Sequence, residues 1–243
     1  MRNIYIDCGT HLGEGLKKHI ESLGIDESWS IYTFEANKYT YDILKEKREN
    51  VTEFDLPDQY KWIKWDNIEY YNKAVWIKDG FIDFYCSTIS NRDLLNQTED
   101  YLNFIKYHDK LVSDGDLLLP HQRDDYPVDG SSTIFPNYFR EIMSVVGDSL
   151  QKNLIWEDKI TIESFDFSNW LRENVTEEDY VVCKIDIETA EFEVLKKCIL
   201  DDTLRLINIL DIEFHHFNDP NYTNDYKIIM SEINRLGIKF KNW

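Results

Sequence analysis

Cysteine is scarce in this sequence, and its four positions fit no metal site. Cys8, Cys86, Cys183 and Cys198 form no Cys-x-x-Cys pair and no histidine–cysteine pattern, which excludes the common zinc sites. Cys8 and Cys183 fall within apolar, strand-like runs, where a reduced thiol packs as a small core side chain. Buried free thiols are typical of a reducing compartment, so we expect a cytoplasmic location.

Basic residues are also in deficit. The chain has 27 Lys and Arg against 46 Asp and Glu, which gives a formal net charge of −19. Nucleic-acid binding normally requires a positive surface that releases counterions from phosphate, and an anionic bilayer selects for the same surface. We therefore expect no nucleic acid and no membrane as a partner, while the composition leaves the oligomeric state open.

Long hydrophobic runs are missing as well. No apolar run approaches the roughly 20 residues that cross a bilayer, and no basic stretch followed by an apolar segment opens the chain, so we expect no secretory signal. With 42% hydrophobic residues among 243, the composition is that of one folded domain spanning 1–243.

Short apolar runs alternate with segments of helical periodicity along most of the chain. Predicted strands lie at 3–8, 31–34, 68–76, 81–86, 159–162, 180–187, 205–214 and 238–240, and predicted helices cover approximately 12–23, 38–50, 166–173, 188–200 and 223–236. This alternation predicts the α/β class, with a doubly wound, mostly parallel sheet in which strand 3–8 lies between 31–34 and 180–187.

Two segments depart from the alternation. Asp79-Gly80 lies between strands 68–76 and 81–86 and predicts a hairpin there. Residues 87–157 hold prolines and polar clusters without a clean period, and we interpret them as an inserted lid with short helices at 98–112 and 137–147.

A turn with two glycines follows the first predicted strand. Asp7-Cys8-Gly9-Thr10-His11-Leu12-Gly13 has the spacing D-x-G-x-x-x-G, which is neither the dinucleotide pattern G-x-G-x-x-G nor a phosphate-binding loop with Gly-Lys-Ser/Thr. Gly9 allows a sharp turn and a close approach of a ligand to the backbone. Glu35 ends the next strand, where a carboxylate accepts hydrogen bonds from the two hydroxyls of a ribose. A ligand with a ribose and no phosphates fits this pair, and S-adenosylmethionine is such a ligand.

The most specific motif lies at the end of strand 180–187. Lys184-Ile185-Asp186-Ile187-Glu188-Thr189-Ala190-Glu191-Phe192-Glu193-Val194-Leu195 resembles the K-x-D-I-E-G-x-E-x-x-V-L signature of the FkbM family of methyltransferases. Further matching stretches, which run from residue 4 to about 216, are Ile6-Asp7-Cys8-Gly9 with Gly13, Phe34-Glu35-Ala36, Asn72-Lys73-Ala74-Val75, Ser131-Ser132-Thr133 and Ile212-Glu213-Phe214-His215. The sequence departs from the family at Thr189, where glycine is usual, and at His11, where a small or amide residue is usual.

The resemblance implies a Rossmann-like class I methyltransferase that transfers a methyl group from S-adenosylmethionine to a hydroxyl of a sugar, a glycan or a related small molecule. It implies cofactor contacts from the loop after the first strand and from the ends of the next two strands, namely Asp7, Gly9, Thr10, His11, Gly13, Glu35 and Asn72. It places Asp186, Glu213 and His215 toward the acceptor.

A sugar hydroxyl is a poor acid and must lose its proton during methyl transfer. His215 is the expected general base, because imidazole titrates nearest to neutrality. The alternative is a divalent cation, held by Asp186 and Glu213 together with a histidine, that lowers the pKa of the hydroxyl.

Three other functions compete with this interpretation. Lys184, Asp186 and Glu213 weakly resemble the Lys-Asp-Lys-Glu set of an RNA cap 2′-O-methyltransferase, but a second lysine is missing and the net charge is −19. A methyltransferase fold that serves as a non-catalytic binding module is suggested by Thr189 alone. A nicotinamide dehydrogenase is disfavoured by the spacing of the glycines.

Overall fold

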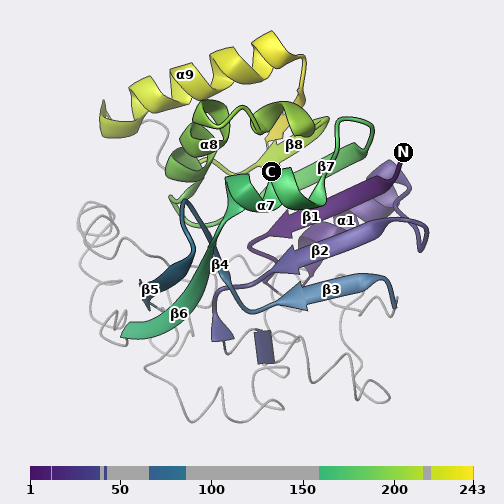
Figure 1. Ribbon diagram of the computed structural model, residues 1–243, viewed down its shortest axis with the longest axis horizontal. Helices are drawn as coiled ribbons and strands as arrows, with labels where there is room; N and C mark the ends of the chain where they lie inside the picture. The colour runs from purple at the N-terminus through teal and green to yellow at the C-terminus, as the bar shows by residue number, and fades with distance from the viewer. Residues whose placement is uncertain (12, 39–40, 43–65, 86–158, 216–219, 243) are drawn as a thin grey trace, which may run out of the picture.

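The computed structural model describes residues 1–11, 13–38, 41–42, 66–85, 159–215 and 220–242. These residues form a six-stranded sheet in the order β3-β2-β1-β7-β8-β9 and a three-stranded sheet in the order β4-β6-β5 (Figure 1). The predicted lid at 87–157 with its two helices, and most of the predicted helix 38–50, lie outside the described residues.

The six-stranded sheet has the predicted doubly wound arrangement. Its strands are β1 (Asn3–Cys8), β2 (Ser30–Phe34), β3 (Ile68–Tyr71), β7 (Tyr180–Ile185), β8 (Ile209–Ile212) and β9 (Lys239–Asn242). Every neighbouring pair in this sheet is parallel, and β1 lies between β2 and β7 as predicted. The strand order reverses at β1, so the carboxyl ends of β1 and β7 border the crevice where such sheets bind ligands.

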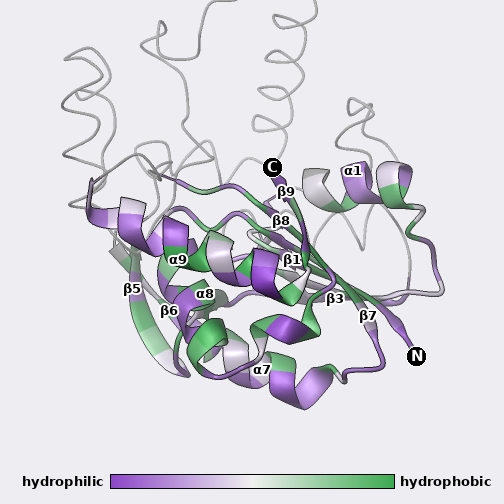
Figure 2. Ribbon diagram, turned by 90° about the horizontal axis from the view of Figure 1, so that it is seen from above, coloured by the Kyte–Doolittle hydropathy of each residue, from purple (hydrophilic) through white to green (hydrophobic). Residues whose placement is uncertain are grey.

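Helices cover both faces of this sheet. Figure 2 shows α1 (Glu14–Leu23) on one side of the strands and α7 (Phe167–Asn174), α8 (Glu191–Leu200) and α9 (Pro220–Leu236) on the other. The alternation along β1 matches the two layers, because Ile4 and Ile6 belong to the core under α7–α9 whereas Tyr5 packs with Leu16 of α1. Among the described helices, none is long and apolar enough to cross a membrane.

A buried polar contact attaches α1 to the sheet. His19 is 1% exposed, and its Nε2 lies 3.0 Å from the Asp211 carboxylate of β8. Its Nδ1 lies 3.0 Å from the Tyr5 hydroxyl of β1 and 2.9 Å from the Gly15 carbonyl. Because buried polar atoms need partners, this set of contacts fixes where α1 sits, and with it the loop that joins β1 to α1.

The second sheet corrects the predicted hairpin. Its strands are β4 (Ala74–Trp76), β5 (Gly80–Tyr85) and β6 (Lys159–Asp166). Strand β6 lies between the other two, parallel to β4 and antiparallel to β5, so the hairpin expected across Asp79-Gly80 is wrong. The reason is a long-range partner: β6 is longer than the predicted strand 159–162, and it packs Ile162 and Phe165 into the protein interior.

Other boundaries also differ from prediction. The run 68–76 is two strands in different sheets, separated at Asn72-Lys73. The predicted strand 205–214 is a strand only at Ile209–Ile212, after the 3-10 turn η4 (Leu204–Leu206). Helix α8 begins at Glu191 rather than 188, because Glu188 and Thr189 have left-handed backbone angles, with φ of 54° and 85°.

Candidate active site at the carboxyl edge of the sheet

The loop after β1 crosses the ends of both neighbouring strands. The N–H groups of Gly9 and Thr10 donate to the Phe34 carbonyl of β2, at 2.9 and 3.1 Å. Gly9 has φ of 78°, and a Cβ at this position would lie 1.8 Å from the Asp186 carbonyl oxygen beyond β7. Glycine is therefore required here both for its backbone angle and for the close contact between the two chain segments.

Glu35 lies at the end of β2 with its carboxylate turned toward this loop. It is 8% exposed, and each carboxylate oxygen accepts a backbone N–H at 2.7 Å, from His11 and from Asn37. Burial raises the pKa of Glu35, and the charge of His11 and the two N–H donors act against that rise. A carboxylate oxygen has capacity for two hydrogen bonds, so, with respect to the residues that the structure describes, each oxygen retains one acceptor position for a ligand hydroxyl.

The other predicted cofactor residues have different roles. The Thr10 hydroxyl is directed at the Asp7 and Phe34 carbonyls, at 3.1 and 3.3 Å, so this side chain holds the loop. Gly13 has φ of 91°, and a Cβ there would meet no described atom within 4 Å. The Asn72 amide donates to the Glu35 carbonyl at 2.9 Å and to the Ala36 carbonyl at 3.2 Å, which positions the segment that carries Glu35.

Lys184 joins the loop to the other half of the sheet. The sequence places it in the FkbM signature and in a weak RNA methyltransferase pattern, but gives it no role in the site. Its side chain is 3% exposed, and its Nζ donates to the Gly9 carbonyl at 2.6 Å. The same Nζ lies 3.5 Å from Asp7 and 3.4 Å from Asp186. Asp7, Lys184 and Asp211 are register partners on three adjacent strands, so a single charged residue at equivalent places in otherwise apolar strands was the available signal.

Asp186, Glu188 and His215 converge beside this lysine. One ligand atom from each residue lies within 4.8 Å of the others, and all three side chains are partly buried. Asp186 follows β7 and His215 follows β8, as the sequence predicts for neighbouring parallel strands. The sequence does not single out Glu188, because the predicted helix 188–200 puts it in a first turn, where carboxylates are common without a function.

A second carboxylate orients the imidazole. His215 Nδ1 lies 3.0 Å from Glu191 Oε1, and the same oxygen accepts the Ile187 N–H at 2.9 Å. Because a carboxylate accepts, Nδ1 carries a hydrogen and Nε2 faces Glu188, 3.4 Å away. Glu191 is fully buried at the start of α8, so a residue of a rigid helix fixes the orientation of the His215 ring.

The charges in this cluster shift one another's pKa. Burial lowers the pKa of His215, but the hydrogen bond to Glu191 and the nearby carboxylates raise it by more, so that the pKa is about 10. Burial raises the pKa of Glu188 to about 8, against the opposing effect of His215. Burial and the charge of Asp186 also raise the pKa of Glu213.

Glu213 lies at the margin of the cluster. Its side chain is 47% exposed, and its Oε1 is 3.9 Å from His215 Nε2. The structure therefore brings Glu188, rather than Glu213, together with Asp186 and His215.

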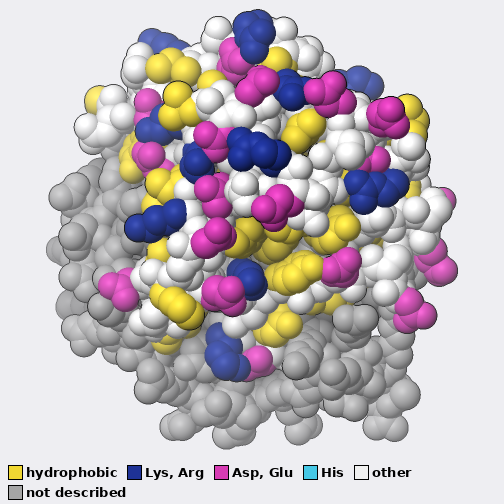
Figure 3. All heavy atoms as spheres, in the orientation of Figure 1, with side chains coloured by type: hydrophobic (Ala, Val, Ile, Leu, Met, Phe, Trp, Pro, Cys, Tyr) yellow, Lys and Arg dark blue, Asp and Glu magenta, His cyan; other side chains and the backbone are white. Residues whose placement is uncertain are grey.

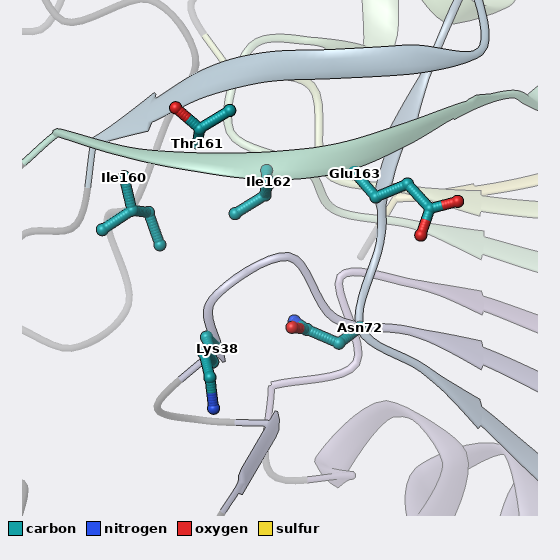
Figure 4. Close-up of a pocket in the computed structure, with 6 residues that line it drawn as sticks. All are labelled: Lys38, Asn72, Ile160, Thr161, Ile162 and Glu163. Atoms are coloured by element: carbon teal, nitrogen blue, oxygen red, sulfur yellow. The ribbon is translucent and has the colours of Figure 1, made fainter.

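A cavity of about 410 Å³ lies on the Asn72 side of the site. Figure 4 shows Ile160 and Ile162 of β6 turned toward the segments that carry Asn72 and Lys38, and Glu163 completes the lining with Thr161. The apolar wall of β6 and the amide of Asn72 give this cavity the mixed character of a small-molecule site.

Comparison with known proteins agrees with the geometry. The family model described as the methyltransferase FkbM domain matches residues 7–240. Searches of curated proteins and of solved structures found no match. The family match covers most of the sheet, the loop after β1 and the cluster around His215, and this chain belongs to the FkbM methyltransferase family.

Proposed function

We propose that the protein is an S-adenosylmethionine-dependent O-methyltransferase that acts on a hydroxyl of a sugar, a glycan or a related small molecule. One observation carries the proposal: Lys184 Nζ contacts both the Gly9 carbonyl and the Asp186 carboxylate, at 2.6 and 3.4 Å. The loop suited to an adenosine ligand and the cluster suited to an acceptor are thus adjacent parts of one site.

The residues after β1 and β2 suit this cofactor. The acceptor positions left on Glu35 match the two ribose hydroxyls, and the chain offers no lysine in this loop for a phosphate group. The cavity beside Asn72, with Ile160 and Ile162 as its apolar wall, has the character that an adenine ring requires. When bound, S-adenosylmethionine supplies a methyl group that its positive sulfur has already activated.

The chain's own task is to position the acceptor hydroxyl and to remove its proton. The cluster of Asp186, Glu188 and His215 lies at the carboxyl ends of β7 and β8, where an acceptor would reach the cofactor loop. At neutral pH the raised pKa of His215, about 10, keeps the imidazole protonated, so it acts as a base only after Nε2 has lost its proton. Transfer then moves the methyl group to the acceptor oxygen and the hydroxyl proton to the cluster.

Isotope-labelled methyl transfer tests this function. The wild-type protein is incubated with methyl-labelled S-adenosylmethionine and a panel of glycans, and the products are mapped by mass spectrometry. We expect a labelled methyl ether on one hydroxyl, and we expect His215→Ala to lower its rate of formation by about 100-fold or more, the usual contribution of general acid–base groups. Glu173→Gln, an exposed change on α7, is the control and should transfer at the wild-type rate.

The same experiment separates the competing functions. Binding of S-adenosylhomocysteine with no methyl transfer to any member of the panel would contradict the enzymatic proposal and favour a binding module. Label on nitrogen instead of oxygen would contradict the assignment as an O-methyltransferase. Equal rates for His215→Ala and wild type would remove His215 from the mechanism.

A further inference from the structure

We propose that Asp186, Glu188 and His215 bind one divalent cation of the magnesium–manganese class. This inference deepens the proposed function, on which its catalytic role rests, but binding of the cation is measurable without any methyl transfer. The set differs from the one expected from the sequence, because Glu188 replaces Glu213.

The first support is the convergence of ligand atoms from three separate places in the chain. An oxygen of Asp186, an oxygen of Glu188 and a ring nitrogen of His215 lie within 4.8 Å of one another. A cation bonded at about 2.1–2.3 Å to each ligand holds neighbouring ligand atoms roughly 3–4.5 Å apart. The observed spacing therefore needs only a small side-chain adjustment to close around an ion.

The second support is the orientation of the imidazole. A metal-binding histidine usually donates its other N–H to a carboxylate or carbonyl, which fixes the ring and its tautomer. His215 does so through Nδ1, 3.0 Å from Glu191, and Glu191 is itself held by the Ile187 N–H at 2.9 Å. Nε2 is thereby directed at Glu188, toward the place where an ion would lie.

The third support is local charge. Four carboxylates, those of Asp186, Glu188, Glu191 and Glu213, lie around one imidazole, and Lys184, 3.4 Å from Asp186, adds one further positive charge. The carboxylates still outnumber the positive groups. A partly buried group of like charges is costly unless a cation balances it. Two carboxylates with one imidazole suit the harder divalent ions, and Mn²⁺ tolerates both donor types.

Such an ion would act on the acceptor. A divalent cation would lower the pKa of a hydroxyl that it binds, so the acceptor would release its proton to water, with His215 as a ligand of the ion instead of the base. The three residues would then serve the proposed O-methyl transfer as ligands of the cation, and Nε2 of His215 would bind the ion in place of a proton.

Binding of Mn²⁺ is the direct test. Protein freed of metal by a chelator is titrated with Mn²⁺, and free Mn²⁺ is followed by electron paramagnetic resonance. We expect one Mn²⁺ per chain and a loss of affinity of at least about 10-fold in Glu188→Gln and in Asp186→Asn. Circular dichroism and thermal unfolding of each variant verify that the fold is retained.

Glu213→Gln is the matched control, since it changes a carboxylate of the same cluster that lies outside the proposed set. Unchanged Mn²⁺ affinity in this variant supports the assignment, whereas a loss equal to that of Glu188→Gln contradicts it. Absence of stoichiometric Mn²⁺ binding to the wild type, or full affinity in both Glu188→Gln and Asp186→Asn, overturns the proposal. S-adenosylhomocysteine binding, measured on the same samples, shows whether the proposed function survives that result.

Discussion

Gly9, in the loop after β1, and Thr189, beside the cluster of Asp186, Glu188 and His215, both have left-handed backbone angles, but only threonine carries a side chain. Gly9 has φ of 78° and no side chain, as the crowded contact with Asp186 requires. Thr189 has φ of 85° and a β-branched side chain that is 1% exposed. Within the described residues, its hydroxyl has no hydrogen-bond partner. Glycine at position 9 therefore suits its backbone angle, whereas threonine at position 189 is strained beside the cluster.

Gly9→Ala should lower the free energy of unfolding by about 3 kcal/mol or more. The new Cβ would combine the left-handed penalty with a contact of 1.8 Å to the Asp186 carbonyl oxygen, which the backbone must move to relieve. Urea denaturation measures the change. Gly13→Ala is the control, because φ there is 91° but a Cβ meets no described atom within 4 Å, so about 1–2 kcal/mol is expected. Equal losses of stability in the two variants would show that the contact with the Asp186 carbonyl does not contribute to the effect of Gly9→Ala.

Thr189→Gly should stabilise the protein by about 1 kcal/mol. Glycine removes the left-handed penalty and the buried hydroxyl, and these gains exceed the lost methyl contact and the greater freedom of the unfolded chain. The free energy of unfolding, compared with that of Thr189→Ala, separates the two gains, since alanine removes the hydroxyl and keeps the strain. A less stable Thr189→Gly protein would mean that the threonine side chain supports the turn.

At this scale the sequence predicted residues that follow strands better than residues that follow bends. Glu35 was placed correctly as a strand-end carboxylate near the Gly9 loop, because both follow adjacent parallel strands. Glu188 was not, because its left-handed turn delays the start of α8 and points the carboxylate at His215 instead of along a helix. A β-branched threonine gives no sequence signal for such a turn.

Among the elements, one ion pair joins β1 and β7 at their amino ends. Arg2, just before β1, donates to Asp179, just before β7, from its backbone N–H at 2.9 Å and its guanidinium at 2.6 Å. Asp179 also accepts the Thr176 N–H and hydroxyl, at 3.0 and 2.9 Å. This ion pair lies at the edge of the sheet opposite the candidate site, and it helps to set the register between β1 and β7, the two strands that border the site.

Asp179→Asn should therefore lower the free energy of unfolding near pH 7 by about 1–2 kcal/mol, a modest value because Arg2 is half-exposed. The guanidinium and hydrogen bonds hold the pKa of Asp179 well below its ordinary value, while burial opposes this. A pKa depressed by folding gives stability that is complete above about pH 4 and is lost as pH falls through the folded-state pKa. Denaturation at several pH values should show the two proteins converging in acid, and a difference that persists unchanged at low pH would contradict this account.

The elements that depend on local pattern were predicted, and those that depend on distant partners were not. The parallel order around β1 follows from alternating apolar runs and helical periods. The pairing of β4 and β5 with β6 could not be predicted in this way, since β6 begins only at Lys159, beyond the segment 86–158. Asp79-Gly80 is a common hairpin signal, but here each flanking strand has β6 as its neighbour.

The molecule as a whole carries more acidic than basic side chains. On the face in Figure 3, Lys and Arg side chains are interspersed with Asp and Glu instead of forming a basic stripe. Several lysines of the described chain are paired with acids, as in Lys196 with Asp225 at 2.8 Å and Lys197 with Asp201 at 2.7 Å. With a net charge of −19, a phosphate backbone would be repelled over most of the protein.

We therefore expect no measurable binding of a capped RNA at about 0.15 M salt, followed by fluorescence anisotropy. A labelled basic peptide of similar size serves as the control for the optical signal. A Kd below about 1 µM at that ionic strength would contradict the assignment of a small-molecule or glycan acceptor and revive an RNA substrate.

The central claim is that the Gly9 loop and Glu35 hold the same adenosine, and calorimetric titration with S-adenosylhomocysteine tests it most directly. We predict that the wild type binds one ligand per chain and that Glu35→Ala weakens binding by roughly 1–3 kcal/mol, about 5- to 150-fold in Kd. The control Glu69→Ala, at an exposed carboxylate of β3, should bind like the wild type. No binding by the wild type, or an unchanged Kd in a folded Glu35→Ala protein, would contradict the account.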